Sequence, residues 1–342
     1  MSKPVCLTSL SLAELEEQLK NIGEPAFRAR QIFSWIYRAR KTDFSEFSDL
    51  PKSLRQRLNE TFVINPLKLT QEISSKDGTT KYLFELPDGY FIETVLIPAA
   101  DRRTVCLSTQ VGCKYHCSFC ASGLNGFKRN LTAGEIVSQV LSVRMFTGQE
   151  VSNLVFMGMG EPLDNLDNVL KAIRILNDER GLSLGARRMT VSTAGVIPGI
   201  KKLKDFELQI NLSISVHNPI EEKRSQLMPI NKKYPLSEVV AAAEDYLKAG
   251  VRQLTLEYIL IKGFNDGLYE AEGLAAIARK LKAKVNLIAY SPVPQLSYER
   301  PSRAELLRFE RWLTERKVKT TIRQSKGVEI AAACGQLAGK FQ

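Results

Sequence analysis

The alternation of short apolar strands with helical stretches constrains the fold of this chain more than any other feature. Five expected strands each precede a helical stretch, and a sixth is expected at residues 104–108. Such alternation is typical of consecutive βα units, which build a parallel sheet. The sequence therefore predicts about six parallel strands curled into an open barrel, with functional residues just after the strand ends. The other five strands are expected at residues 153–157, 189–192, 210–215, 253–260 and 284–289.

Two different patterns precede this α/β region. Ser11 and Glu14 resemble a capping box that opens the first of three expected helices in residues 1–66. From residue 67 to 108 the pattern changes to short β-rich runs. Two Asp-Gly pairs, which are hairpin turn signals, interrupt these runs at residues 77–78 and 88–89. The sequence thus predicts a small helical domain and a β connector ahead of the barrel.

Composition limits the classes of protein to which the chain can belong. Its 342 residues are 44% hydrophobic and 25% charged, which is typical of a globular protein with a substantial core. The net charge of +11 favours a polyanionic partner, although a solvated basic face on an ordinary protein would look the same. No apolar run reaches the roughly 20 residues of a membrane span, and the N-terminus lacks the apolar stretch of a secretory signal. We therefore expect a cytoplasmic protein, without membrane attachment, whose clustered cysteines are metal-binding or catalytic.

Cys113, Cys117 and Cys120 form a CxxxCxxC motif in the loop after the first barrel strand. Three thiolates can hold three irons of a [4Fe–4S] cluster and leave the fourth iron open. The open iron can chelate the amino and carboxylate groups of a methionine moiety. The alternative is a structural zinc site that adds His116 or His217 to these cysteines. Zinc sites usually draw their ligands from two separated pairs, and the chain has no second CxxC.

Several motifs resemble, in order and spacing, those of the radical S-adenosylmethionine (SAM) adenosine C2-methyltransferases, and the resemblance covers essentially the whole chain. It implies a partial (βα)6 radical SAM barrel at residues 99–327. A helical accessory domain at 1–66 and a β connector at 67–98 would precede the barrel, and a tail at 328–342 would carry a methyl-accepting cysteine. The matching segments are residues 108–120, 126–131, 157–163, 192–193, 215–217, 229–233 and 333–339.

The residues expected to hold SAM follow the barrel strands. Gly160 permits close backbone approach, and the Glu161 carboxylate can receive the ammonium group of SAM. The same tripeptide occurs at residues 23–25 within the helical domain, so position after a strand distinguishes the two. The resemblance assigns further SAM contacts to Ser192, Ser215, Val216, His217 and Ser291. Ser291 stands where the family usually has asparagine, and serine keeps a hydroxyl but lacks the reach of the amide.

Carbon 2 of adenine is electron-poor and has no acidic proton, so simple methyl displacement would fail there. The resemblance implies that Cys334 first takes a methyl group from SAM. A second SAM, cleaved at the cluster to a 5′-deoxyadenosyl radical, then removes hydrogen from the S-methyl group, and the resulting carbon radical adds to adenine. Cys106 would release the product by forming a disulfide with Cys334. Glu93 matches the proposed proton acceptor, although without the resemblance it would be interpreted as a surface strand carboxylate.

The resemblance also implies the partners. The targets would be an adenosine of the 23S rRNA peptidyl-transferase centre and one in the tRNA anticodon loop, where a base is easily unstacked. A flavodoxin-like donor would reduce the cluster, a thiol reductant would restore the cysteines, and the protein would be a monomer. Three alternatives stay open: methylation of adenine carbon 8, radical SAM chemistry on a non-RNA substrate, and a zinc-stabilised RNA-binding protein. Cys334 argues against the last two, because neither needs a thiol in the tail.

Overall fold

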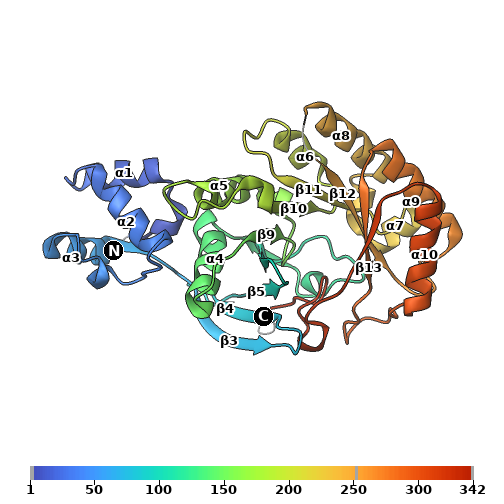
Figure 1. The fold of residues 1–342 in the computed structure, drawn as a ribbon, viewed down its shortest axis with the longest axis horizontal. Helices are drawn as coiled ribbons and strands as arrows, with labels where there is room; N and C mark the ends of the chain where they lie inside the picture. The colour runs from blue at the N-terminus through green and yellow to red at the C-terminus, as the bar shows by residue number, and fades with distance from the viewer. Residues whose placement is uncertain (1–3, 251–252, 340–342) are drawn as a thin grey trace.

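A ten-stranded mixed sheet forms the centre of the computed structural model, which describes residues 4–250 and 253–339 (Figure 1). Expectations for residues 1–3 and 340–342 lie outside the described part. Along the sheet the strands follow the order β14-β13-β12-β11-β10-β9-β6-β5-β4-β3. Their bounds are β3 (Lys68–Ser74), β4 (Thr80–Glu85), β5 (Phe91–Pro98), β6 (Arg103–Cys106), β9 (Asn153–Phe156), β10 (Met189–Thr193), β11 (Asn211–Ser215), β12 (Leu254–Leu260), β13 (Lys284–Ala289) and β14 (Thr320–Arg323).

The strands β6, β9, β10, β11, β12 and β13 pair in parallel, each with the next one in this list, while β7 (Gln110–Gly112) and β8 (Phe127–Asn130) form a separate hairpin between β6 and β9. The six predicted parallel strands are therefore confirmed. β12 is buried at every position, which fits a central strand with both faces covered. The sequence missed the seventh parallel strand, β14, because its four residues Thr-Thr-Ile-Arg are short and largely polar.

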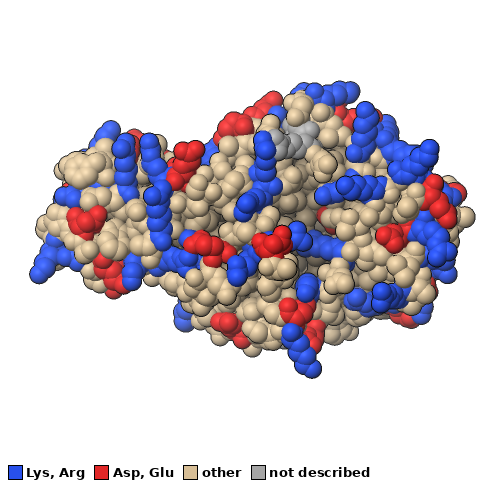
Figure 2. All heavy atoms as spheres, in the orientation of Figure 1, with Lys and Arg blue, Asp and Glu red and all other residues tan. Residues whose placement is uncertain are grey.

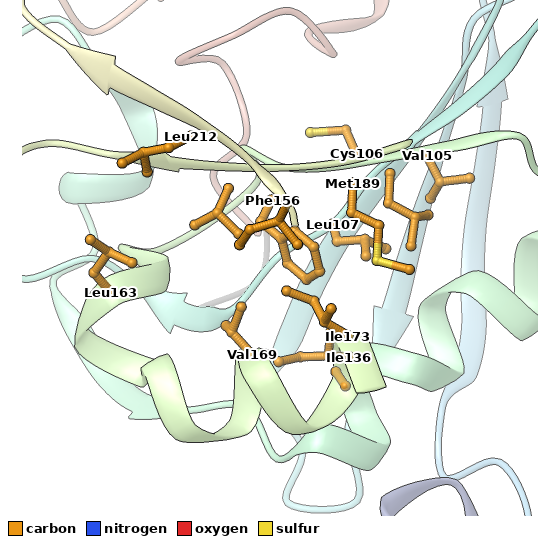
Figure 3. Packing of buried hydrophobic residues seen from close by; sticks show 14 of the residues in the cluster. Val105, Cys106, Leu107, Ile136, Phe156, Leu163, Val169, Ile173, Met189 and Leu212 are labelled. Carbon is orange, nitrogen blue, oxygen red and sulfur yellow. The ribbon is translucent and has the colours of Figure 1, made fainter. Parts of the chain in front are cut away.

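Helices follow the parallel strands and cover them (Figure 1). They are α4 (Ala133–Thr147), α5 (Leu166–Asn177), α6 (Ile197–Leu203), α7 (Glu221–Leu227), α8 (Leu236–Lys248), α9 (Leu268–Lys280) and α10 (Arg303–Glu315). Figure 3 shows the resulting core, in which the side chains include Val105, Phe156 and Met189 from the strands and Ile136, Val169 and Ile173 from α4 and α5. Within residues 4–250 and 253–339, no helix is long and apolar enough to cross a lipid bilayer.

The β-rich segment extends the same sheet. β3, β4 and β5 form antiparallel hairpins, and β5 pairs with the first barrel strand, β6. Both predicted turns are present, with Gly78 and Gly89 at positive φ angles of 83° and 84°. Because β5 pairs directly with β6, side chains of β4 and β5 lie close to the barrel and the chain terminus.

The N-terminal module contains the three expected helices: α1 (Leu12–Asn21), α2 (Phe27–Tyr37) and α3 (Lys52–Thr61). Ser11 caps α1 as predicted, because Glu14 Oε2 accepts the Ser11 amide at 2.7 Å and Ser11 Oγ accepts the Glu14 amide. A parallel pair of two-residue strands, β1 (Val5–Cys6) and β2 (Phe62–Val63), closes the module and was not predicted. The module lies at one end of the molecule (Figure 1).

Candidate functional site

A cavity lies at the carboxyl ends of the parallel strands. It encloses about 830 Å³ of empty space, part of it open to solvent. Segments that follow β6, β9, β10 and β11 line it, together with β12, β13, β14 and the C-terminal tail. The predicted site residues that line it are Cys113, Cys117, Cys120, Gly160, Glu161, Ser192, Ser215, His217 and Cys334.

Four predicted residues lie outside this lining. Cys106 lines a second, adjacent cavity, while Glu93 contacts the C-terminal tail. Val216 is fully buried, and its amide donates to the Glu257 carbonyl at 3.0 Å. Ser291 is also buried and lies just past the end of β13. The structure therefore brings most, but not all, of the predicted SAM contacts to one cavity.

A small β-hairpin supports the cysteine loop. β7 (Gln110–Gly112) pairs with β8 (Phe127–Asn130), and Cys113 follows β7 directly. Gly112 adopts a φ of +70°, and a Cβ atom there would lie 1.7 Å from the Gly126 carbonyl oxygen. Only glycine fits at this close approach. The loop then turns back on itself through a hydrogen bond from the Cys120 amide to the Cys117 carbonyl.

The three cysteine side chains suit a cluster. Burial raises the pKa of Cys113 to about 12, and it also raises the pKa values of Cys117 and Cys120, which lie close enough to repel one another when ionised. Bound iron would reverse these shifts, because it stabilises thiolates. Among the described residues, no three His, Cys, Asp or Glu side chains form a group that could hold a single metal ion. Three thiols in one short loop beside a cavity are the donor set of a [4Fe–4S] cluster with an open iron, so the residues present fit that group.

Gly160 and Glu161 are tightly constrained. Gly160 has a φ of +96°, and a Cβ atom there would lie 2.4 Å from Gln110 Cβ. The Glu161 carboxylate accepts the Leu163 amide at 3.0 Å and the Ala194 amide at 2.8 Å. Burial nevertheless raises the pKa of Glu161 to about 7. Each carboxylate oxygen has a second lone pair, so a cationic ligand would find an acceptor there and would favour the ionised form.

Glu161→Gln is expected to weaken SAM binding by about 10- to 100-fold, because a charge-assisted hydrogen bond to an ammonium is worth roughly 1.5–3 kcal/mol. The matched control is Glu24→Gln in the same tripeptide, where Glu24 pairs with Arg57 in the N-terminal module. Calorimetric titration of SAM into reconstituted proteins of equal iron content measures the effect. Equal SAM affinity in both variants would contradict the role of Glu161.

His217 is a neutral donor at the cavity wall. Its Nδ1 accepts the Ile259 amide at 3.1 Å, so the ring proton lies on Nε2. The ring packs edge-on against Phe119, with centroids 4.9 Å apart. Burial, assisted by the positive charge of Arg224, lowers the pKa of His217 to about 3. His116 Nδ1 also has a partner, the Gly123 carbonyl at 2.8 Å, so both histidines of the zinc alternative are engaged through one nitrogen.

The low pKa of His217 predicts a pH-dependent stability. The unfolded chain protonates this histidine below pH of about 6.5, whereas the folded chain does not, so stability falls as pH decreases. Between pH 7.5 and 5.5 the loss attributable to His217 is about 1.4 kcal/mol. Urea unfolding at both pH values should show this loss in the wild type and not in His217→Gln, with His116→Gln as the control for losing an imidazole. The same pH dependence in wild type and His217→Gln would refute it.

Two cavity residues were missed by sequence reasoning. Glu257 lies in the middle of β12, where it is buried and Asn286 Nδ2 donates to its Oε1 at 3.0 Å. A carboxylate inside an otherwise mainly apolar strand was the signal that could have identified it. Arg323 ends β14 and lines both cavities, with Nη1 3.5 Å from Met157 Sδ. It was overlooked because its strand was not predicted.

Cys334 lies at the boundary between the two cavities. It lines the first cavity with the three cluster cysteines and the second with Cys106. Both thiols are free. Burial raises the pKa of Cys106 to about 12, the neighbouring Cys334 sulfur adds to this effect, and the positive charge of Arg323 opposes it. The two cysteines are therefore in one electrostatic environment.

The loop that carries the cluster cysteines also positions the tail. The Ala121 amide donates to the Gly335 carbonyl at 2.7 Å, and Ser122 Oγ donates to the Leu337 carbonyl at 2.6 Å. Asn125 Nδ2 donates to the Ala338 carbonyl at 3.0 Å. These hydrogen bonds fix the backbone on the C-terminal side of Cys334 beside the first cavity.

Glu93 is buried, so its interpretation as a surface strand carboxylate is wrong. It is 2% exposed, on β5. Its Oε1 pairs with Lys81 Nζ at 2.9 Å, and its Oε2 accepts the amides of Ala338 at 2.7 Å and Gly339 at 3.1 Å. The carboxylate thus joins the β-hairpins to the C-terminal tail.

Comparisons with known proteins give a consistent result. Residues 107–273 match the family model of the radical SAM superfamily, and residues 5–64 match the N-terminal domain of ribosomal RNA large subunit methyltransferases. The chain is 48% identical to a probable dual-specificity RNA methyltransferase RlmN of Bacillus cereus, over 99% of this chain and 94% of that protein. It is 49% identical to the equivalent protein of Geobacillus kaustophilus, over 97% and 92%. The crystal structure of a radical SAM methyltransferase from Sphaerobacter thermophilus matches with a TM-score of 0.96 at 45% identity, covering 98% of this chain and all of that one.

Proposed function

The chain belongs to the RlmN family of radical SAM RNA methyltransferases, and we propose that it methylates carbon 2 of an adenosine in the 23S rRNA peptidyl-transferase centre and in the tRNA anticodon loop. Membership makes it an enzyme that methylates RNA. One observation supports the proposed two-cysteine mechanism: Cys334 lies between a cavity lined by the three clustered cysteines and a cavity lined by Cys106. In the proposed mechanism the methyl-accepting thiol must lie near the cluster, where SAM binds, and near Cys106, which releases the product.

Cys113, Cys117 and Cys120 would hold a [4Fe–4S] cluster, and Glu161 would hold the ammonium group of SAM. When bound, the cluster supplies the electron that breaks a sulfonium bond of SAM. Gly160 lets the backbone approach the ligand closely, and the His217 Nε2–H is available as a donor. Three of the remaining predicted SAM contacts are hydroxyls: Ser192 and Ser215 line the cavity, and Ser291 lies outside its lining. Val216 would contact SAM through its backbone.

Cys334 supplies the carbon that reaches adenine. Its thiolate attacks the methyl group of SAM, so that a new S–C bond forms as the sulfonium bond breaks. The 5′-deoxyadenosyl radical takes a hydrogen atom from this S-methyl group, and the remaining carbon radical adds to carbon 2 of adenine. Loss of one electron, which the oxidised cluster would accept, and of the carbon 2 proton restores the ring and leaves the RNA joined to Cys334 through a thioether. The positive charge of Arg323 opposes the burial that raises the pKa of Cys106.

Cys106 is the releasing thiol in this scheme. Attack by its thiolate on the Cys334 sulfur forms an S–S bond and breaks the C–S bond, leaving an electron pair on the product carbon that takes up a proton. A cellular thiol reductant then restores both cysteines. Glu93 is the proposed acceptor of the proton that leaves adenine, but in this structure the tail amides occupy its Oε2. Glu93 is also 2% exposed and lines neither cavity, so the tail would have to move before this carboxylate could meet adenine.

On the face drawn in Figure 2, Lys and Arg side chains spread over both the N-terminal module and the barrel. Lys232 ends a short 3-10 helix, Pro229–Lys232, that follows α7, and Lys233 comes next in the chain. Such groups suit contacts with RNA phosphates. The proposed setting is the cytoplasm, with a flavodoxin-like electron donor and a monomeric protein.

The proposed function is tested by anaerobic reconstitution with iron and sulfide, followed by reductant, methyl-labelled SAM and unmodified 23S rRNA or tRNA transcripts. We expect label in adenosine of both RNAs and 5′-deoxyadenosine as co-product. A reconstituted protein that cleaves SAM and leaves both RNAs unlabelled would contradict the substrate assignment. Label in one RNA alone would contradict dual specificity in this chain.

A further inference from the structure

A buried ion pair beside the tail joins Glu93, the proposed proton acceptor, to Lys81, which has no role in the chemistry described above. Lys81 on β4 and Glu93 on β5 are diagonal neighbours across a hairpin, and their side chains are only 5% and 3% exposed. Neither residue lines either cavity. Burying two charges is costly unless both are paired and their remaining hydrogen-bonding groups are satisfied. The groups that form hydrogen bonds with the two charged side chains therefore indicate what the ion pair does.

Those partners come from the tail, on both sides of Cys334. Lys81 Nζ donates to the Ala331 carbonyl at 3.1 Å, three residues before Cys334. Glu93 Oε2 accepts the Ala338 and Gly339 amides, four and five residues after it. The ion pair thus forms hydrogen bonds to both ends of the segment that carries the methyl-accepting cysteine. The other hydrogen bonds to residues 333–338 described above come from neutral groups.

We propose that the Lys81–Glu93 pair is a latch that holds the tail so that Cys334 lies between the two cavities, and that opening of the latch frees the Glu93 carboxylate. This inference rests on the proposed function for its second half. While the latch is closed, the Glu93 carboxylate is buried between Lys81 and the tail amides and lines neither cavity, so it does not meet a substrate. When residues 331–339 leave, those acceptor positions become available at the moment a base can enter. Lys81 is then a positioning residue, which acts on the reaction through the tail.

Lys81→Met tests the latch, and Lys68→Met is its matched control. Lys68 lies on the neighbouring strand β3 and pairs with Glu85 at the same 2.9 Å, but the Lys68 side chain is exposed, and neither residue forms a hydrogen bond to the described tail residues 331–339. Hydrogen exchange read by mass spectrometry on the full chain, without RNA, reports on the tail amides. We expect exchange of residues 331–339 to be about tenfold faster in Lys81→Met, with unchanged protection in β12. The rate of Cys334 S-methylation by SAM, read from intact mass, should fall about tenfold. Lys68→Met should match the wild type in both.

The outcomes separate the latch from the proposed function. Wild-type exchange and wild-type S-methylation in a folded Lys81→Met protein would overturn the latch. A second outcome is faster tail exchange in Lys81→Met together with a wild-type protein that labels no RNA. It would support the contact between the ion pair and the tail, and it would overturn the proposed function and the role assigned to Glu93. If Lys81→Met is not folded, Lys81→Gln keeps a donor for the Ala331 carbonyl without the charge and decides the question by the same two readouts. Lys81→Arg, which keeps the charge, should recover most of the tail protection.

Discussion

Cys334→Ala is expected to abolish RNA methylation, lowering turnover by about 10⁴-fold or more, because the carbon that reaches adenine would have no carrier. Methyl-labelled SAM and an RNA transcript measure the loss directly. The cluster cysteines are untouched, so iron content should stay at the wild-type level. The variant therefore separates the radical-generating site from the methyl carrier.

Cys6→Ala is the matched control for losing a cysteine. Cys6 lies in the N-terminal module with its sulfur 3.0 Å from Thr8 Oγ1, and it lines neither cavity. It should methylate RNA at the wild-type rate. Substantial RNA methylation by Cys334→Ala would show that the methyl group travels without this thiol, and the proposed mechanism would fail.

Cys106→Ala is expected to stop turnover by a different route, leaving RNA covalently attached to Cys334. Without the second thiol nothing attacks the Cys334 sulfur, so the C–S bond persists after the base has been modified. Cys106 is 7% exposed and shares its cavity with Cys334, so an external thiol is a poor substitute. Near-stoichiometric adduct should accumulate, at no more than about one RNA per protein.

Denaturing gels after treatment with a thiol reductant measure this adduct, because a thioether survives conditions that cleave a disulfide. Nuclease digestion should then leave a modified nucleotide on the peptide that contains Cys334. The double variant Cys106→Ala, Cys334→Ala should give no adduct. Multiple turnovers of free methylated RNA by Cys106→Ala would contradict the releasing role.

Local sequence patterns predicted the strands and turns of this molecule well. Apolar strands and turn glycines are encoded within a few residues, so the parallel strands and both Asp-Gly hairpins follow from the sequence alone. The family resemblance assigned Ser192, Ser215 and His217 to the SAM site, and all three line the cavity at the ends of their strands. It was less informative for Ser291, which lies two residues past β13 and does not reach the cavity lining.

Contacts between distant segments could not be predicted. The hydrogen bond from the Ala338 amide to the Glu93 carboxylate joins positions 245 residues apart, and no pattern in the sequence around Glu93 predicts it. Arg323 was missed for a related reason, because a short polar strand is recognised only by its pairing with β13. Glu257 was within reach of sequence reasoning, since a carboxylate in a buried strand requires an explanation.

The most direct test of the proposed chemistry is the mass of the product nucleoside after reaction with SAM that carries a trideuterated methyl group. The modified RNA is digested to nucleosides, which are compared with 2-methyladenosine and 8-methyladenosine standards. Because one hydrogen atom leaves the S-methyl group before the new carbon bond forms, we predict 2-methyladenosine with two deuterium atoms in its methyl group. A product methylated at carbon 8, or a methyl group that retains all its deuterium, would contradict the account.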